Sequence, residues 1–571
     1  MSIRDFFNSE QKSVKIAALI MIVAVLLSRF LGLIRDRILA GTFGASVDLD
    51  IYYAAFRMPD LIYSIIFAGG ILVSFLPIFS EYQKKNKQDS WNICNTILNS
   101  FAILYFVFFI LFFFLSPDFI SILIGKFSPA YQVEAIGLTR LIFVAVFFFG
   151  LSSIFSTILN YFNRFVAYSL APAFYNLGII LGTIFLSPYF GIYGAGIGVV
   201  VGAFLHFAIQ IPVAIKCGYK YKPIINLKHP GITNFFRLVV PRIVASSASQ
   251  LDFLTATFFA SIVGIGAISV FNLSYNLGYL PIGILGVSFA TAIFPLLSKL
   301  WAEQNKQEFY ANFRKTFLEV LYVAFPVGLL IFVLRNQIVE IVYRTGKFDE
   351  TAVTITAACL GLYFISTFTQ CLVPILLRGF FSIKDTLTPT LIAIVYMLTD
   401  VLLLFPFVVL FGGDPRFAFE FFGRTVAFTM PAFIHANSFL INATHAIFGI
   451  GNINNFPLLG LVLIFNISSL VEFTLLFVFL RRKVGDFGVK QIAVSFLKIF
   501  IATIVMGTVS IFVLNKTAYL FGHNLIGNLS QFIIICLIAF AVYFASTFAL
   551  KSPEIKFLAQ YVKRKMKRNE N

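Results

Sequence analysis

Charged side chains stand inside the first two long apolar stretches of the sequence, where charges are rare. Arg29, Arg35 and Asp36 lie in the first stretch, and Arg57 lies in the second. Because a charge inside a membrane is costly, such residues usually face a partner or a water-filled cavity. Arginine suits bidentate contacts with phosphate oxygens. We therefore expect these arginines to bind an anionic ligand such as a pyrophosphate, with Asp36 orienting its neighbour Arg35.

The two arginines of the first stretch point to different sides of a straight helix. Six residues separate Arg29 from Arg35, which is about 600° of helix rotation. Gly32 lies between them and permits a bend that would bring them together. The alternative is that Arg35 and Arg37 form a cluster at the membrane edge whose side chains extend to water. We favour this alternative for Arg37 and ligand binding for Arg29 and Arg35.

Two further acids, Asp252 and Asp400, lie alone in apolar surroundings. They would bind a coupling cation or titrate, unless each is neutralised by a neighbour that the sequence does not reveal. The sequence has no Walker loop, zinc-ligand pair or hydrolase nucleophile motif. We therefore expect a transporter without a cofactor, apart from a coupling cation of unknown identity, and no metal site is predicted.

The elements that must position these residues are membrane helices. Of 571 residues, 59% are hydrophobic and 12% are charged, and the mean hydropathy is +0.91. Soluble globular proteins have about 25% charged residues. Long apolar runs from end to end exclude a cytosolic enzyme, a disordered protein and a transmembrane β-barrel. The net charge of +18 indicates loops that face anionic membrane lipid rather than a nucleic-acid partner.

A span length of about 20 residues predicts an all-α polytopic membrane protein with about fourteen transmembrane helices. Basic residues follow every second span and fill the C-terminal tail, so the positive-inside rule puts both termini in the cytoplasm. Arg335, Arg344 and Lys347 conflict with this count, which places them outside. The predicted spans are 14–40, 51–82, 92–116, 135–161, 168–187, 193–215, 233–262, 265–299, 310–334, 352–378, 387–411, 456–480, 488–514 and 529–550.

A weak internal repeat suggests two halves. Phe75–Ser80 is similar to Ile293–Ser298, and Leu170–Pro172 is similar to Leu387–Pro389, at offsets close to 218 residues. A shift by six helices keeps both halves in the same orientation, which is a transporter architecture. The alternative is that proline and phenylalanine are simply common near helix ends.

The repeat predicts two six-helix lobes followed by two additional helices. The segment at about 412–455 is too polar for a span and is predicted to be an outer loop with an interfacial helix. The predicted divisions are an N-terminal lobe at 1–222, a C-terminal lobe at 223–486, the added helices at 487–551 and a basic cytoplasmic tail at 552–571.

Three groups of residues follow one another along the chain. The first is Ser28–Asp36 with Phe43–Ala45, Asp50 and Ala55–Pro59. The second is Leu280–Val287 with Phe294–Ser298, and the third is Gly346–Asp349 with Arg378–Pro389. Together they resemble the MurJ/MviN family of lipid II flippases, within the multidrug/oligosaccharidyl-lipid/polysaccharide exporter superfamily.

The resemblance implies two lobes around a cationic cavity and a hydrophobic groove that involves the last two helices. It also implies outward movement of the undecaprenyl-pyrophosphate-linked peptidoglycan precursor by alternating access in a bacterial plasma membrane, and we expect a monomer. The chain departs from the family pattern at Tyr63 or Ser64, where Arg is common, so we expect a less charged cavity. The family's functional charges carry over to Arg29, Arg35, Asp36, Asp50 and Arg57, the last in place of a more usual Lys.

The sequence also allows other functions. A flippase for another polyprenyl-pyrophosphate-linked glycan would need the same arginines. A cation-coupled multidrug exporter would favour an acidic cavity, and a polytopic membrane enzyme such as a glycan polymerase would need a catalytic acid motif. The arginines therefore favour a lipid-linked glycan as the substrate.

Overall fold

The computed structural model describes residues 14–64, 71–414, 416–421, 424–429, 437–448, 457–518, 520–521 and 524–554. The chain folds into two compact units. Unit 1 comprises Met1–Ser269, Thr345–Asp349 and Asp414–Met430, and unit 2 comprises Val270–Arg344, Glu350–Gly413 and Pro431–Asn571. Helix α11 falls in unit 1, so the units divide after residue 269, whereas the predicted lobes divide after residue 222. The lobe boundaries stay a prediction.

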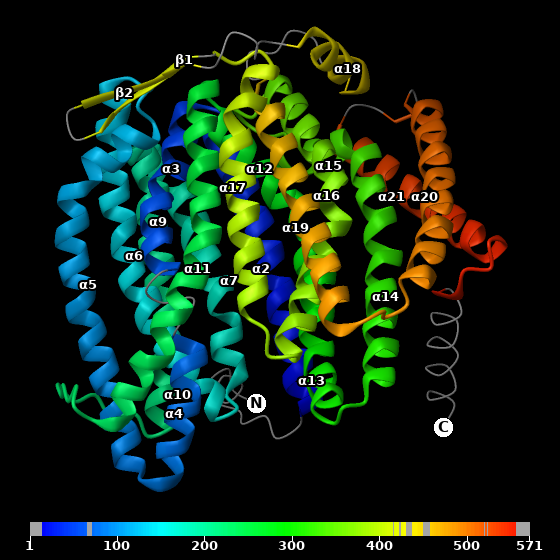
Figure 1. Ribbon diagram of the computed structural model, residues 1–571. Coiled ribbons are helices and arrows are strands. Elements are labelled where there is room, and N and C mark those ends of the chain that lie inside the picture. Colours follow the sequence, from blue (N-terminus) through cyan, green and yellow to red (C-terminus); the bar gives the residue numbers. More distant parts are fainter. Residues whose placement is uncertain are drawn as a thin grey trace. The chain divides into compact units, whose positions relative to one another are not determined.

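Unit 1 is built from long apolar helices that start at recognisable caps. The Asn86 side chain accepts hydrogen bonds from the backbone N–H groups of Gln88 and Asp89 at the start of α5, and Pro129 is the first residue of α6. The helices, most of them labelled in Figure 1, are α2 (Val14–Phe43), α3 (Val47–Tyr63), α4 (Ile71–Lys85), α5 (Lys87–Leu123), α6 (Pro129–Tyr161), α7 (Phe165–Leu181), the π-helical turn η2 (Gly182–Leu186), α8 (Ser187–Phe190), α9 (Ile192–Ala208), α10 (Ile211–Lys216) and α11 (Pro230–Val263).

Glycines bring α7 and the following turn η2 into close contact with α9. A Cβ atom added to Gly178 would lie 2.3 Å from the Cα of Gly202, and one added to Gly182 would lie 2.4 Å from the Cα of Gly198. Such contacts between small residues are a common way for membrane helices to pack, because lipid offers no hydrophobic drive for association. This packing fixes the position of the polar residues that α7 and α9 carry into the interior of unit 1.

Unit 2 has a core rich in phenylalanine, with Phe313 and Phe317 of α14 and Phe380 of α16 fully buried. Its last helix is fastened to α14 by polar contacts, because the Tyr543 hydroxyl donates to the carbonyl of Tyr322 at 2.7 Å. The remaining helices are α12 (Ala267–Gly278), which begins in unit 1, η3 (Ile282–Val287), α13 (Ser288–Ala302), α14 (Lys306–Val333), α15 (Arg335–Tyr343), α16 (Glu350–Ser382), α17 (Leu387–Leu410), α18 (Ser438–Phe448), α19 (Leu458–Val484), α20 (Val489–Thr517) and α21 (Leu525–Ala549).

The predicted membrane spans coincide with helices. Within the described residues, eleven helices are long and apolar enough to cross a membrane, and they correspond to the predicted third to sixth and eighth to fourteenth spans. Helices also occupy the other three predicted spans, as α2, as α3 with α4, and as α11. The all-helical, polytopic fold class is therefore confirmed.

The segment at 412–455 contains two strands that the sequence analysis did not predict. Strand β1 (Arg416–Phe421) pairs antiparallel with β2 (Arg424–Thr429), with Arg416 opposite Thr429. The sequence predicted a loop with a helix here, and the structure adds this hairpin, because phenylalanine recurs at every second position of Arg416–Phe421 with the period of a strand. The expected helix of this segment is α18.

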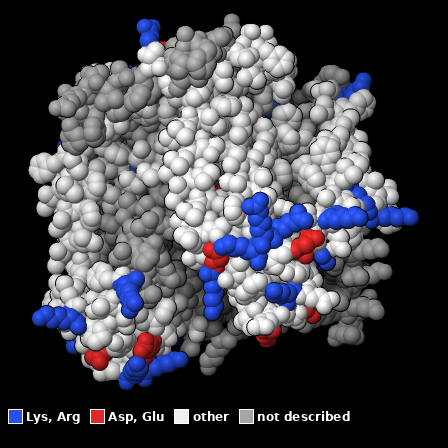
Figure 2. All heavy atoms as spheres, viewed as in Figure 1, with Lys and Arg blue, Asp and Glu red and all other residues white. Residues whose placement is uncertain are grey.

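Charged residues concentrate near helix ends. Figure 2 shows a surface on which most side chains are uncharged and the Lys and Arg side chains gather in patches. Lys84 and Lys85 lie in the last turn of α4, Lys216 lies in the last turn of α10, and Arg481–Lys483 lie in the last turn of α19. This distribution is typical of helices whose middle faces lipid and whose ends reach water.

Candidate functional site

A polar cluster on α2 centres on Arg35. Its guanidinium donates through Nε and Nη2 to Oδ1 of Asp36, at 2.9 and 2.7 Å, and through Nη1 to Oδ1 of Asn176 on α7, at 3.0 Å. The Asp36 side chain is 4% exposed, whereas that of Arg35 is 23% exposed. Asn176 is itself fixed, because its Nδ2 donates to the carbonyls of Ser28 and Pro172. The acid therefore orients the arginine, as expected from their adjacency, and Asn176 adds a partner from a distant helix.

Arg29 and Arg57, the other two predicted arginines, have different surroundings. Arg29 is exposed. Arg57 of α3 donates from Nε to the Thr257 hydroxyl on α11 at 2.6 Å, and its guanidinium lies 5.3 Å from the ring centroid of Phe253. The structure thus brings Arg35 and Asp36 together and holds Arg57 against α11. The contribution of these residues to substrate binding stays a prediction.

Asp50 is buried and caps a helix. Its Oδ2 accepts from the backbone N–H of Gly266 at 2.5 Å, and its Oδ1 accepts from the N–H of Ser269 at 2.7 Å and from the Ser269 hydroxyl. These donors lie at the N-terminal end of α12, where a carboxylate is favoured by the helix dipole and by otherwise unsatisfied N–H groups. The contacts of Asp50 are those of a structural cap, and its predicted contact with substrate stays a prediction.

Close backbone contacts hold the loop between α2 and α3. The N–H of Lys347 donates to the carbonyl of Gly41 at 2.8 Å. A Cβ atom on Gly346, whose φ is +52°, would lie 2.2 Å from that carbonyl oxygen, and one on Gly44, whose φ is +73°, would lie 2.7 Å from the carbonyl oxygen of Lys347. Both sites therefore require glycine. The first and third groups of family-like residues meet at this contact, which fixes the C-terminal end of α2 beyond the Arg35 cluster.

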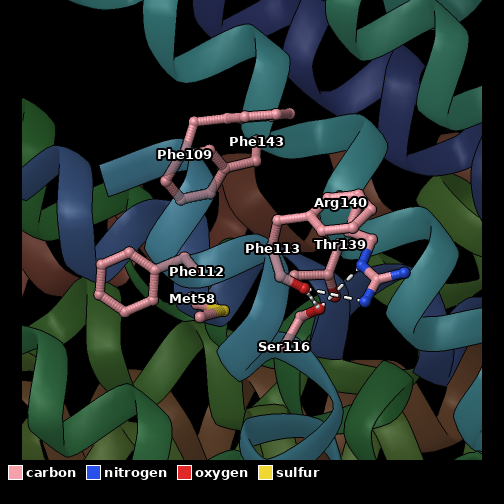
Figure 3. A pocket seen from close by; sticks show the side chains of 8 residues that line it. All are labelled: Met58, Phe109, Phe112, Phe113, Ser116, Thr139, Arg140 and Phe143. Atoms are coloured by element: carbon pink, nitrogen blue, oxygen red, sulfur yellow. Dashed lines mark hydrogen bonds between the residues drawn. The ribbon is translucent and has the colours of Figure 1, made fainter. Parts of the chain in front are cut away.

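Arg140 has a structural role between α5 and α6. Figure 3 shows it in a pocket of phenylalanines, where Nε donates to the Ser116 hydroxyl at 2.9 Å and Nη2 donates to the carbonyl of Phe113 at 2.8 Å. Its guanidinium also stacks 3.9 Å from the centroid of the Phe113 ring. The remaining space is about 10 Å³, room for at most about one water molecule, so the pocket does not serve as a ligand site.

The two acids proposed for ion coupling are both buried. Asp252 on α11 is 6% exposed and Asp400 on α17 is 1% exposed. Burial of acids in apolar helices fits residues that bind a cation or a proton. Their function stays a prediction, and the described residues contain no group of three or more His, Cys, Asp and Glu that could hold a metal ion.

A cavity of about 270 Å³ lies inside unit 1, among α3, α6, α7 and α9. Asp60, Tyr63, Tyr175 and His206 line it together with apolar side chains such as Phe149. His206 and Tyr175 are not among the site residues predicted from the sequence. A signal for His206 was present, because it is a histidine in the middle of an apolar stretch, but a single polar residue does not reveal which helices it faces.

The comparisons with known proteins agree with this architecture. Residues 39–414 match the family model described as "Lipid II flippase MurJ". The chain belongs to this family. A "Lipid II flippase MurJ" from Burkholderia cenocepacia is 30% identical over 68% of this chain and 77% of its own length. A "Probable lipid II flippase MurJ" from Vibrio cholerae is 26% identical over 73% of this chain and 81% of its own length.

Solved structures share the fold of this MurJ-family chain. A "Lipid II flippase MurJ, inward closed conformation" has a TM-score of 0.71 at 24% identity and covers 93% of this chain and 98% of its own. An inward-facing multidrug-resistance MATE transporter has a TM-score of 0.60 at 14% identity and covers 82% of this chain and 98% of its own. Family membership makes the protein a bacterial multi-pass membrane transporter and not an enzyme, as the sequence predicted.

Proposed function

We propose that this chain moves lipid II, the undecaprenyl-pyrophosphate-linked peptidoglycan precursor, from the inner to the outer leaflet by alternating access. Its membership of the MurJ family supports this function, and the described substrate of its relatives is lipid II. The observation that carries the proposal is the fixed Arg35 guanidinium, because it offers the geometry that a pyrophosphate needs.

The hydrogen bonds of Arg35 leave a fork for phosphate. A guanidinium has five N–H donors, and three of them bond to Asp36 and Asn176. Of the other two, one belongs to Nη1 and one to Nη2, and we propose that both point outward along the outer edge of the group. Two parallel donors of this kind match two oxygens of one phosphate. The side chain is held in place before the ligand arrives, which lowers the entropy cost of binding.

The three arginines have different roles in the proposed binding of the pyrophosphate. Asp36 balances the charge of Arg35, so the pair provides oriented hydrogen bonds with little net charge. Arg29 and Arg57 would supply the positive charge that attracts the pyrophosphate. Asp50 would act indirectly, by holding the start of α12.

The lipid tail sets a physical limit on the route. Transferring a polyprenyl chain into water would cost about 0.8 kcal/mol for each CH₂ group. The tail therefore stays in the bilayer while the pyrophosphate and the glycan cross through the protein. Alternation between two half-repeats is a common solution for such transport. Asp252 and Asp400 are the predicted ion-coupling residues, and we expect the protein to act as a monomer.

The same proposal includes the orientation of the chain in the plasma membrane. Both termini lie in the cytoplasm and the 412–455 segment lies outside, because basic residues concentrate in loops on the cytoplasmic side. Membrane-impermeant thiol labelling of intact cells should modify a cysteine introduced at Asp414 and spare one introduced at Lys565. The reverse pattern would overturn this orientation.

Complementation tests the function directly. A bacterium depleted of its essential lipid II flippase should grow when this chain is supplied and should lyse without it. A matched strain that lacks a flippase for another polyprenyl-linked glycan serves as the control for substrate. Rescue of the control strain, with no rescue of the lipid II strain, would contradict lipid II as the substrate.

A further inference from the structure

We propose that the cavity of unit 1 is a proton-binding site, in which Asp60 accepts and releases a proton during transport and His206 connects it to a chain of hydrogen bonds. This inference rests on the proposed transport function and adds its coupling ion. The site differs from the predicted pair Asp252 and Asp400. It is formed by side chains of α3, α7 and α9 with α6 as a wall.

The cavity has room for water molecules, and an acidic side chain lines it. Its volume of about 270 Å³ is several times the roughly 30 Å³ that a water molecule occupies in the liquid. Asp60 lines it from α3, next to the hydroxyl-bearing side chains of Tyr63 and Tyr175. A carboxylate inside a membrane protein is stabilised by water, a cation or a proton, and this cavity places Asp60 where water supplies the proton.

Two pairs of polar residues extend from the cavity between α6 and α9. His206 and Gln210 lie four residues apart on α9 and its extension, and Ser152 and Ser156 lie four residues apart on α6, so each pair shares one helix face. Nδ1 of His206 is 2.7 Å from the Ser152 hydroxyl oxygen. Gln210 donates to that same oxygen at 2.5 Å and accepts from the Ser156 hydroxyl at 2.9 Å. Gln210 is fully buried, so the chain is shielded from bulk solvent.

These bonds give His206 two protonation states. When the Ser152 hydroxyl donates to Nδ1, the neutral imidazole carries its hydrogen on Nε2. When the ring gains a second proton, at Nδ1, that nitrogen donates to the Ser152 oxygen, and the ring, protonated at both nitrogens, is a cation. Both states satisfy Nδ1 with the same partner, so the ring gains or loses a proton without losing that hydrogen bond. The proton on Asp60 comes from hydronium, which leaves water, and returns to water on release.

The chemistry of the lining favours a proton over a metal ion. Asp60, Tyr63 and Tyr175 offer carboxylate and phenol oxygens, and His206 adds one nitrogen. Ca²⁺ takes six to eight oxygen ligands and Mg²⁺ takes six, which is more than the side-chain oxygens of this set. The lining matches an acid and a base that exchange a proton through water.

Other ionisable groups surround Asp60 and would influence its protonation. They are Arg57 and Tyr63 on α3 and Tyr175 on α7, and the cavity lining takes His206 from α9. The positive charge of Arg57 favours the carboxylate form of Asp60. Binding of an anionic pyrophosphate near Arg57 would weaken this effect on Asp60. Substrate binding would therefore promote uptake of a proton.

Infrared difference spectroscopy tests proton binding without substrate. Purified protein in lipid nanodiscs should show a carboxylic-acid C=O band that appears between alkaline and acidic buffer. The band should be absent from Asp60→Asn and present in the control Asp118→Asn, which removes an acid of α5 outside the cavity. A band that persists unchanged in Asp60→Asn would overturn the proposal.

Transport in proteoliposomes tests the coupling. The wild-type flipping rate should respond to an imposed pH gradient, and this response should be lost in Asp60→Asn and retained in Asp118→Asn. If Asp60→Asn fails to fold, His206→Gln should lose the same response. An undiminished response in either folded variant would reject the site.

Wild-type flipping with neither a gradient response nor the infrared band would reject the proton site and leave the proposed transport function standing. The band without any lipid II flipping would support the site and contradict lipid II transport.

Discussion

The two units place different chemistry in comparable positions. In unit 1 the second span brings Asp60 and an opposing His206 to a cavity of about 270 Å³. In unit 2 the eighth span lines a pocket of about 10 Å³, with Tyr279, Ser366 and Gln370 among its walls. Ionisable acid and base groups in one unit are thus matched by neutral hydroxyls and amides in the other. We therefore place the proposed pyrophosphate site of Arg35 and the proposed proton site of Asp60 in unit 1, whereas the pocket of unit 2 is lined by aromatic and neutral polar side chains.

The predicted repeat sharpens this difference. An offset of 218 residues pairs Arg57 with Tyr275. Arg57 is held by Thr257 and Phe253, whereas Tyr275 stacks on Tyr279 with ring centroids 5.5 Å apart. If the two halves arose from one ancestral unit, the second exchanged a charge for an aromatic ring. Substitutions of Arg35 and Asp60 in unit 1 should therefore affect transport, and substitutions in the neutral network of Ser366 in unit 2 should affect mainly stability.

The largest expected effect is at Arg35. Arg35→Ala should lower the flipping rate by about tenfold to a hundredfold, because hydrogen bonds to a charged group contribute about 1.5–3 kcal/mol. Arg35→Lys should recover part of the rate, since lysine keeps the charge beside Asp36 and lacks the planar fork. Flipping of labelled lipid II in proteoliposomes measures the rate.

The controls for Arg35 separate folding from binding. Arg35→Ala leaves the buried Asp36 without its partner, so the double variant Arg35→Ala/Asp36→Asn removes that charge as well. It should fold and remain inactive. Arg37→Ala, two residues along the same helix, should transport normally. Normal transport by Arg35→Ala would remove the pyrophosphate site from this cluster.

The next effect is on stability, at Asp50. Asp50→Ala removes the acceptor for two backbone N–H groups and should lower the free energy of unfolding by about 1–3 kcal/mol. Thermal unfolding in detergent measures this loss. Asp50→Asn should lose less stability, because an amide oxygen still accepts. If Asp50→Asn were fully stable and inactive, Asp50 would contact substrate and would not be a cap alone.

A smaller effect is expected in the neutral network of unit 2. The Ser366 hydroxyl donates to the Asn466 side chain and accepts from Gln370 at 3.1 Å. Ser366→Ala should cost about 1 kcal/mol of stability and leave the flipping rate close to that of the wild type. A tenfold loss of rate in a stable Ser366→Ala protein would break the contrast between the units.

The smallest effect concerns acid stability at the loop before α17. Burial alone would raise the pKa of Asp385, but hydrogen bonds from Lys483 and Thr388 outweigh it and hold the pKa below its usual value of 3.8. A pKa that is lower in the folded state stabilises the protein above pH 3.8, and the contribution is lost as the pH falls through the folded value. Lys483→Met should flatten this acid dependence in unfolding curves. An unchanged acid dependence would show that the 2.5 Å Lys483–Asp385 contact adds no stability.

The sequence predicts features that depend on neighbours along the chain. The spans follow from the length of apolar runs, and the Arg35–Asp36 pair follows from adjacency. The sequence did not predict partners that are distant along the chain: Asn176 lies 141 residues from Arg35, and Ser269 lies 219 residues from Asp50. The hairpin of 416–429 carried a strand pattern, but a polar segment between spans is more often a loop. Which helices enclose the cavity of Asp60 and His206 depends on glycine contacts between α7 and α9, and the sequence does not specify their pairing.

The most direct test of the central claim is the transbilayer movement of fluorescent lipid II in proteoliposomes that contain the purified protein. The wild-type chain should move lipid II between leaflets faster than protein-free vesicles, and Arg37→Ala should match it. Arg35→Ala should be about tenfold to a hundredfold slower than the wild type, because hydrogen bonds to a charged group contribute about 1.5–3 kcal/mol. Equal rates for wild-type and protein-free vesicles would contradict lipid II flipping by this chain, and equal rates for wild type and Arg35→Ala would contradict the Arg35 site.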